Sequence, residues 1–256
     1  MGIDKKRVHL RFARAADTYD RQSFIQRQVA DHLLNLLVHA GCDHPESILE
    51  IGCCTGLLTG RLTGHFTSIN TLHVNDLVDS FKKSVEKKIA SRDIDFIFLS
   101  GDIEQIRLPQ QYDLIISSST FHWLDDLPGL FNRLHRHLRP GGFLGFAMYG
   151  PDNLWELKKL TGIGLEYAGL SVLRKMVAKD FNIHACEGKK VVVHFDDPLL
   201  LLQHLRETGV NALARTSCSR RQLQTFRERY EQQFGSEQGV RLTYHPMYIV
   251  ARTSLY

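Results

Sequence analysis

Short apolar runs recur through the first 150 residues of the chain, and most are bounded by Gly, Pro or polar residues. Runs of this kind are typical of strands that are buried on both faces. We expect strands at 47–52, 69–76, 94–100, 112–119 and 142–149. The segments between them are long enough to hold helices, as at 77–91 and 126–138. The pattern therefore predicts alternating strands and helices.

The flanking parts of the chain have a different pattern. Apolar residues at helical spacing predict a helix from 20 to 39. The last strand is expected at 242–254, and because it contains Pro246 we expect it at a sheet edge or at a bulge. Between the fifth strand and this last one we expect a mainly helical segment at 152–180, a strand at 189–195 and helices at 197–208 and 219–234.

Strands that are apolar on both faces and alternate with helices indicate an α/β fold with a mostly parallel sheet covered on each side. Because the crossovers between parallel strands are right-handed, such a sheet is doubly wound, and ligands bind at the carboxyl ends of its strands. Candidate functional residues are therefore expected directly after Ile51, Val74, Leu99 and Ile116.

The composition is that of one soluble globular domain, with 256 residues, 43% hydrophobic and 23% charged. No segment has the pattern of a signal peptide or a membrane span, so we expect a cytoplasmic protein without a membrane partner.

Five cysteines without a C-x-x-C pair predict reduced thiols rather than disulfides or a zinc site. The formal charge of +4 argues against a nucleic-acid partner and suggests a different anionic one.

The turn after the first strand is rich in glycine and leads into a helix. Its residues are Gly52, Cys53, Cys54, Thr55 and Gly56. Glycines let backbone amides approach a ligand closely, and a helix start offers unpaired N–H groups. The second strand ends in Asn75 and Asp76, where a carboxylate can accept hydrogen bonds from ribose hydroxyls. These features suit both a nicotinamide dinucleotide and S-adenosylmethionine.

Two positions bear on the choice between these cofactors. Glu50 lies in the first turn, where it would repel a phosphate group and attract a cationic amino group or sulfonium. The third strand leads to Asp102 and Ile103. The carboxylate can accept from an adenine amino group, and the apolar side chain can cover the ring. These residues favour S-adenosylmethionine.

The fourth strand leads into small polar groups and then into an aromatic wall. Ser117 and Ser118 end the strand, and Trp123 follows in the next segment. Aromatic faces attract cations, so such a wall suits a sulfonium. We find no His, Cys or acidic cluster with the spacing of a metal site, and expect no metal.

A family resemblance rests on the order and spacing of these motifs. LEIGCCTG, VND, GDIE, YDLIISSS and LRPGGFL, over roughly residues 45–150, are similar to the motif series of class I S-adenosylmethionine-dependent methyltransferases. A narrower resemblance extends over almost the whole chain, to the malonyl-acyl carrier protein O-methyltransferases of biotin synthesis. It is carried by FARAADTYDRQSFIQRQVADHL, GDIEQIRLP, SSSTFHWLDDL, HFDDPLLLLQHLRETGVNA and LTYHPMYIVA.

The resemblance implies a Rossmann-like, seven-stranded sheet within a single methyltransferase domain over residues 1–256. Its expected parts are an N-terminal helical arm at 1–40, a cofactor-binding core at 45–150, a helical insertion or lid after strand 5 at 151–188, and C-terminal strands and helices at 189–256.

The resemblance also implies a reaction and its partners. A methyl group passes from S-adenosylmethionine to the free carboxylate of a malonyl thioester, which gives a methyl ester in an early step of biotin synthesis. The malonyl group is carried by an acidic acyl carrier protein or by coenzyme A, and the enzyme is expected to be a monomer. A carboxylate with a pKa of roughly 4 is already ionised at neutral pH, so we expect no general base.

The resemblance assigns roles to particular residues. Tyr19 matches the tyrosine that lies over the cofactor, and His122 replaces a frequent glutamine; we expect both to position the reactants. Trp123, Tyr244 and His245 are expected at the substrate. Trp123 is equally compatible with a core position, and the other two with a simple cross-strand pair.

Cys54 departs from the family pattern, which usually has glycine at this position. A side chain there narrows the approach of the backbone to the cofactor, and it is strained if φ is positive. Because of Cys54, the chain could be a non-catalytic relative that binds acyl carrier protein. A second alternative, independent of Cys54, is a methyltransferase of the same fold that acts on another small metabolite.

Overall fold

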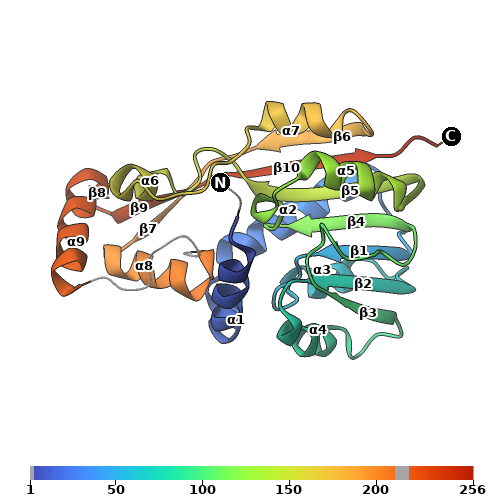
Figure 1. The fold of residues 1–256 in the computed structure, drawn as a ribbon, viewed down its shortest axis with the longest axis horizontal. Helices are drawn as coiled ribbons and strands as arrows, with labels where there is room; N and C mark the ends of the chain where they lie inside the picture. Colours follow the sequence, from blue (N-terminus) through green and yellow to red (C-terminus); the bar gives the residue numbers. More distant parts are fainter. Residues whose placement is uncertain (1–2, 211–218, 256) are drawn as a thin grey trace.

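The computed structural model describes residues 3–210 and 219–255, and a seven-stranded sheet in the order β3-β2-β1-β4-β5-β10-β6 forms its centre (Figure 1). Strands β1 to β5 pair in parallel, whereas β10 is antiparallel to both of its neighbours. The expected mostly parallel, Rossmann-like sheet is confirmed. Its strands are β1 (Ser47–Ile51), β2 (Thr71–Asp76), β3 (Asp95–Ser100), β4 (Tyr112–Ser118), β5 (Leu138–Tyr149), β6 (Asn182–Gly188) and β10 (Pro246–Arg252).

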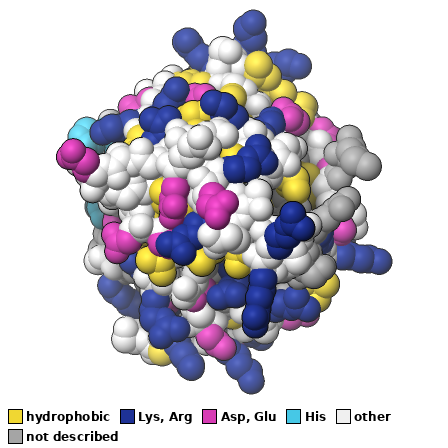
Figure 2. All heavy atoms as spheres, turned by 90° about the vertical axis from the view of Figure 1, so that its left-hand side faces the viewer, with side chains coloured by type: hydrophobic (Ala, Val, Ile, Leu, Met, Phe, Trp, Pro, Cys, Tyr) yellow, Lys and Arg dark blue, Asp and Glu magenta, His cyan; other side chains and the backbone are white. Residues whose placement is uncertain are grey.

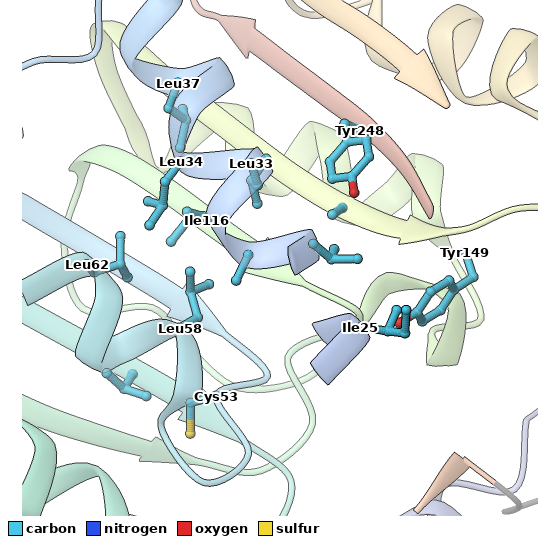
Figure 3. Close-up of a cluster of buried hydrophobic side chains, with 14 of the residues drawn as sticks. Ile25, Leu33, Leu34, Leu37, Cys53, Leu58, Leu62, Ile116, Tyr149 and Tyr248 are labelled. Atoms are coloured by element: carbon cyan, nitrogen blue, oxygen red, sulfur yellow. The ribbon is translucent and has the colours of Figure 1, made fainter. Parts of the chain in front are cut away.

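Helices cover both faces of this sheet, and each face has its own buried apolar cluster. The first cluster lies under α2, α3 and α4, and Figure 3 shows side chains of α2 and α3 packed over β4 within it. The second lies under α5 and α7. These helices are α2 (Phe24–His39), α3 (Leu57–His65), α4 (Lys82–Ile89), α5 (Leu127–Arg136) and α7 (Leu170–Val177).

A second, three-stranded sheet in the order β7-β9-β8 lies at one end of the molecule, with α6, α8 and α9 (Figure 1). Local sequence fixes two of these helix starts. Asp197 caps α8 ahead of Pro198, and Ser219 and Gln222 form a capping box on α9. The elements are α6 (Trp155–Thr161), β7 (Val191–Phe195), α8 (Pro198–Glu207), α9 (Arg220–Phe234), β8 (Gly235–Ser236) and β9 (Gly239–Tyr244).

The first helix, α1 (Lys5–Gln22), lies between the two sheets and faces the carboxyl ends of the main-sheet strands (Figure 1). Asp4 caps its start by accepting a hydrogen bond from the Arg7 amide. On its other side α1 packs against α8, where the Thr18 hydroxyl donates to the Glu207 carbonyl at 2.9 Å. The expected N-terminal helical arm is therefore present as α1 and α2. Two short 3-10 helices, η1 (Asp79–Phe81) and η2 (Phe121–Trp123), complete the described elements.

Two expectations about the later part of the chain are wrong. The expected strand at 242–254 is two strands in different sheets, since β9 ends at Tyr244 and β10 begins at Pro246. Pro246 lies neither at an edge nor at a bulge, because β10 runs between β5 and β6 and its irregularity falls between Val250 and Ala251. A proline is tolerated at the first residue of a strand, where the chain crosses from one sheet to the other.

The expected helical insertion at 151–188 is also corrected. Its helices are the short α6 and α7, and its last part, Asn182–Gly188, is the edge strand β6 of the main sheet. This strand has no fully buried residue, so it lacks the strong apolar run of the central strands. The larger insertion between core strands is the stretch 189–245, which holds the second sheet.

Candidate active site

A cavity of about 700 Å³, its open mouth included, lies at the carboxyl ends of β1 to β4 and is closed on one side by α1. This is the edge at which the sequence pattern places a ligand. Nine of the expected site residues line it: Tyr19, Gly52, Cys54, Asn75, Asp76, Asp102, Ile103, Ser118 and Trp123.

The turn after β1 passes close to other backbone and side-chain atoms. Gly52 has φ of +74°, and a Cβ there would lie 2.0 Å from Thr120 Oγ1, so only glycine fits. Cys54 has φ of +49°, which places a side chain in the left-handed region. Its backbone amide donates to Asp76 Oδ2 at 2.8 Å. The strain foreseen for a positive φ at Cys54 therefore applies.

Asp76 is held at the end of β2 by backbone donors. Besides the Cys54 amide, the Val78 amide donates to Oδ1 at 2.9 Å. Burial raises the pKa of this carboxyl to about 6, against the effect of these hydrogen bonds. The neighbouring Asn75 amide group donates to the carbonyls of Leu99 and Gly101, so it joins the ends of β2 and β3.

Glu50 lies behind the turn and is fully buried. The Thr59 hydroxyl donates to its Oε2 at 2.7 Å, while Oε1 has no hydrogen-bond partner among the described residues. Burial raises the pKa of Glu50 to about 8. A buried acceptor without a donor is costly, so Oε1 is a position where a cationic or N–H donor of a ligand would be stabilising.

The N-terminus of α1 is joined to the loop after β3 by ion pairs. The Lys5 ammonium lies 2.6 Å from Asp102 Oδ2 and also pairs with Glu104. Burial works to lower the pKa of Lys5, but the two carboxylates outweigh it and raise that pKa. Ile103, directly after Asp102, is buried in the cavity wall.

Aromatic side chains from α1 and from η2 form one wall of the cavity. The Phe12 ring lies edge-on to Trp123, with centroids 6.0 Å apart, and 6.5 Å from the Tyr19 ring. Burial raises the pKa of the Tyr19 phenol well above its usual value. This wall can exclude water and attract a cation.

Four cavity residues of α1 were not foreseen: Lys5, Val8, His9 and Phe12. With Tyr19 they lie on one side of a helix that begins fifteen residues before the predicted one. These four residues are spaced i, i+3, i+4 and i+7, as residues on one face of a helix are. This spacing is the signal in the sequence that could have identified them.

Several other expected site residues lie outside the cavity wall and have partners within the fold. Thr55 donates to Asp20, Ser117 donates to the Ile51 carbonyl, and Gly56 begins α3 against Val85 of α4. Cys53 is buried behind the turn, with its sulfur 3.9 Å from Asp76 Oδ2.

The expected substrate residues on β9 and in the following turn are also engaged. The Tyr244 hydroxyl lies 2.7 Å from His204 Nε2, and His245 Nδ1 accepts from the Asp152 amide at 3.2 Å. His122 lies behind the aromatic wall, with its ring 5.1 Å from that of Trp123. Burial lowers the pKa of His122 to about 3, so its imidazole is neutral.

The arrangement suits a cofactor that has a cationic amino-acid end, a ribose and an aromatic base. Glu50 Oε1 is a buried acceptor, Asp76 is a carboxylate at the carboxyl end of β2, and Ile103 and the aromatic wall supply apolar surface. Within the described residues, no group of three or more His, Cys, Asp and Glu side chains is placed to hold a metal ion.

Comparison with known proteins is consistent with this geometry. Residues 49–146 match the methyltransferase domain family. A malonyl-acyl carrier protein O-methyltransferase of Prosthecochloris aestuarii is 36% identical over 254 residues, covering 98% of this chain and 94% of that protein. One from Haemophilus influenzae is 37% identical over 257 residues, covering 98% and 96%.

Solved structures share the fold at low sequence identity. The structure of a putative methyltransferase from Bacillus halodurans superimposes with a TM-score of 0.62 at 13% identity, covering 87% of this chain and 98% of that one. The N-methyltransferase NodS of Bradyrhizobium japonicum in complex with S-adenosyl-L-homocysteine gives 0.53 at 14% identity, covering 92% and 98%. By its full-length relatives and its fold, this chain belongs to the malonyl-acyl carrier protein O-methyltransferase family of class I methyltransferases.

Proposed function

We propose that this protein transfers the methyl group of S-adenosylmethionine to the free carboxylate of malonyl-acyl carrier protein, giving the methyl ester. One observation carries the proposal. The chain is similar over nearly its full length to malonyl-acyl carrier protein O-methyltransferases, and it has a cavity at the carboxyl ends of its parallel strands. Carboxylates at and behind the cavity wall can accept hydrogen bonds from that cofactor. The wall near Ser118 and Trp123 is made of hydroxyls and aromatic rings, and a carboxylate nucleophile needs no base there.

The chain's own residues would act by binding and orientation. At the cavity wall Asp76 accepts from the ribose hydroxyls and Asp102 with Ile103 takes the adenine, while Glu50 Oε1, which is buried behind the lining residues, receives the cationic amino group. The aromatic residues of α1 and η2 exclude water, which strengthens electrostatic attraction inside the cavity. When bound, S-adenosylmethionine supplies an electrophilic methyl group on a sulfonium.

The reaction balances without a proton transfer. A bond forms between a carboxylate oxygen and the methyl carbon while the carbon–sulfur bond breaks, and its electron pair stays on sulfur as a neutral thioether. Holding oxygen, carbon and sulfur in line contributes most, because well-oriented reactants can gain on the order of 7–11 kcal/mol. Tyr19 and His122 fit the role of positioning groups, since burial keeps both neutral at physiological pH.

The finer features of partner and compartment belong to the same proposal. We place the protein in the cytoplasm as a monomer that prefers the carrier protein to coenzyme A. The four described cysteines have free thiols, as in a reducing compartment, and Cys218 lies outside the described residues. None of the described helices is long and apolar enough to span a membrane.

The test offers purified protein and S-adenosylmethionine three thioesters of the carrier protein: malonyl, succinyl and acetyl. We expect a methyl ester from the malonyl compound, much less from the longer succinyl compound and none from the acetyl compound, which has no carboxylate. Calorimetry with S-adenosyl-L-homocysteine tests the cofactor site separately. Binding without any methyl ester would leave the non-catalytic alternative, and absence of binding would contradict the site itself.

A further inference from the structure

We propose that Ser119, His122 and Tyr149 form the subsite that binds and orients the substrate carboxylate. The proposal rests on the function proposed above and adds to it the residues that hold the nucleophile. These residues account for three of the six buried side-chain atoms that have no hydrogen-bond partner among the described residues: Ser119 Oγ, His122 Nδ1 and the Tyr149 hydroxyl.

The three residues converge at the ends of neighbouring strands. Ser119 follows β4 and its amide donates to the Ala147 carbonyl of β5 at 2.8 Å, two residues before Tyr149. The Ser119 hydroxyl lies near enough to the Tyr149 phenol to act on its pKa as a hydrogen-bond donor and offset part of the burial-driven rise, although the contact between the two oxygens falls short of hydrogen-bond geometry. The His122 ring lies 5.2 Å from the Tyr149 ring. The unpartnered atoms are therefore neighbours rather than scattered defects.

The group adjoins the proposed cofactor cavity through Ser119, the one of the three residues that lines it. Ser119 lines that cavity, and His122 and Tyr149 stand behind the wall that Ser119 forms with Trp123. Figure 3 shows Tyr149 beside Ile25 of α2 at the end of the apolar cluster, so its ring is held by packing on one side. A carboxylate at this wall would be next to the region assigned to the sulfonium.

Four other tyrosines of the chain have a hydrogen-bond partner for the phenol hydroxyl. Tyr112 bonds to His73, Tyr167 to Asn153, Tyr230 to a backbone carbonyl, and Tyr244 to His204. Tyr149 is only 3% exposed and its hydroxyl has no such partner among the described residues. Because an unsatisfied buried hydroxyl destabilises a fold, its retention is explained by a ligand that pairs with it.

The backbone at Ser119 adds a separate observation. Its φ is +60°, a left-handed conformation that is uncommon for a residue with a side chain. Strained residues of this kind cluster at functional sites, where the strain fixes a side chain in a particular direction. Here the conformation places a small hydroxyl in the cavity wall, with its oxygen shielded from solvent.

The donor set identifies the ligand as a carboxylate. Two hydroxyls and an imidazole N–H can donate three hydrogen bonds to a planar anion with two oxygens. Burial keeps His122 neutral, and Lys5, the lysine of the cavity wall, already pairs with Asp102 and Glu104. Neutral donors orient the carboxylate but leave its charge available for attack on the methyl carbon, whereas an ion pair with Lys or Arg would reduce that charge.

The experiment compares S119A, Y149F and the double variant with wild type, and with Y112F as the matched control. Y112F also removes a buried phenol hydroxyl, but one that pairs with His73 at the opposite end of β4. We expect kcat/KM for the malonyl thioester to fall about tenfold or more in Y149F and further in the double variant, as for a lost hydrogen bond to a charged group. Affinity for S-adenosyl-L-homocysteine should stay unchanged in both.

Thermal unfolding separates a binding role from a structural one. Because the Tyr149 hydroxyl lacks a protein partner, Y149F should unfold at the same Tm as wild type or higher, whereas Y112F, which loses a hydrogen bond, should unfold at a lower Tm with normal kcat/KM. A binding measurement with the homocysteine complex adds the ligand class. Wild type should bind malonyl-coenzyme A more tightly than acetyl-coenzyme A, and the double variant should lose this preference.

The outcomes distinguish the two proposals. If wild type esterifies the malonyl thioester and the double variant does so equally well, the subsite is wrong and the proposed function stands. If Y149F loses activity only in proportion to a lowered Tm, the hydroxyl is structural and the subsite is again wrong. If wild type makes no methyl ester from the malonyl thioester, the proposed function itself fails.

Discussion

Cys54 stands in the cofactor turn with a left-handed backbone, where this chain has a side chain in place of the usual glycine. For a residue with a Cβ this conformation costs roughly 1–2 kcal/mol. Its amide still donates to Asp76, so the strained backbone keeps the hydrogen bond that fixes this carboxylate, the proposed ribose acceptor. The departure therefore alters the free energy of the turn more than its geometry.

Restoring glycine at this position tests that interpretation. We expect Cys54→Gly to bind S-adenosylmethionine equally or more tightly, because the cavity widens and the backbone strain is relieved. The Tm should change little, since a new glycine adds unfolded-state entropy worth about 0.4–1 kcal/mol. Calorimetry and thermal unfolding measure both, with Cys53→Ala as a control at a neighbouring thiol. Clearly weaker binding by Cys54→Gly would mean that the cysteine side chain contacts the cofactor.

Glu50 makes the stability of the free protein depend on pH in an unusual direction. Its pKa is raised from 4.5 to about 8, so the folded state holds a proton that the unfolded chain releases. Stability should therefore decrease as pH rises from about 5 to 8. Glu50→Gln cannot ionise, so it should lose less stability over this window, by up to a few kcal/mol.

The same variant should bind the cofactor more weakly at pH 8, because an amide lacks the charge that attracts the amino group. Thermal unfolding at pH 5 and pH 8, with and without S-adenosyl-L-homocysteine, measures both effects. Asp76, whose pKa is raised to about 6, adds a pH dependence of its own in both proteins, and its charge is also one of the causes of the raised pKa of Glu50. Parallel pH profiles for wild type and Glu50→Gln would contradict the assignment.

At the level of elements, α1 closes the cavity and its first turn is tied to the loop after β3. Lys5 is about one-fifth exposed and pairs with two carboxylates that are less exposed still. The rest of the helix is held by Phe12 and Tyr19 at the aromatic wall and by Thr18 against α8. Ion pairs therefore hold both ends of α1, because Asp20 near its C-terminus pairs with Lys88 of α4, and the pair at Lys5 is the one that joins the helix to the loop after β3.

Removing this attachment should weaken cofactor binding. We expect Lys5→Ala to raise the Kd for S-adenosyl-L-homocysteine about fivefold, since an ion pair of this kind contributes on the order of 1 kcal/mol. The effect should come from faster dissociation, which stopped-flow fluorescence can follow. Lys6→Ala, at the exposed neighbouring lysine, is the control and should leave binding unchanged. Tighter binding by Lys5→Ala would instead show that Lys5 competes with the adenine for Asp102.

The strands that the sequence predicts correctly have a stronger apolar pattern than the strand that it misses. The strands of the core are apolar on both faces, so β1, β2 and β4 were found almost to the residue. The edge strand β6 has a weak apolar pattern, so the sequence predicts helix there, whereas the other edge strand, β3, has a continuous apolar run at 96–99 and is predicted correctly. The division at Pro246 depends on which sheet each half joins, and this is decided by packing that no local pattern records.

The site shows the same division between local and long-range information. The residues after β1, β2 and β3 were predictable because parallel strands place their carboxyl ends at one edge. Lys5 and Phe12 were missed because their helix comes from elsewhere in the chain to cover that edge. Tyr149 was missed because its significance lies in an unpartnered hydroxyl, which only the packed structure reveals.

At the scale of the whole molecule, the second sheet adds a charged end beside the catalytic core. Figure 2 shows Lys and Arg side chains over much of this end, with Asp and Glu between them. Exposed basic residues on α6, α9 and β9 include Lys159, Arg220, Arg221, Arg229 and Arg241. A surface of this sign attracts an acidic protein, and screening by salt weakens such attraction.

Salt dependence therefore distinguishes recognition of the carrier from recognition of the acyl group. We expect the KM for malonyl-acyl carrier protein to rise severalfold between low and physiological ionic strength, because the Debye length falls to about 8 Å at 0.15 M. The KM for malonyl-pantetheine, which lacks the carrier's charges, should change little. Equal salt dependence for the two substrates would mean that the basic surface does not bind the carrier.

The most direct test of the whole account is mass spectrometry of malonyl-acyl carrier protein after incubation with the purified protein and S-adenosylmethionine. The account predicts that the malonyl thioester gains one methyl group, that mild alkaline hydrolysis removes it as methanol, and that the acetyl thioester is unchanged. A malonyl thioester of unchanged mass, from a protein that binds the cofactor, would contradict it. So would a methyl group that stays on the malonate freed by alkaline cleavage of the thioester and is not released as methanol.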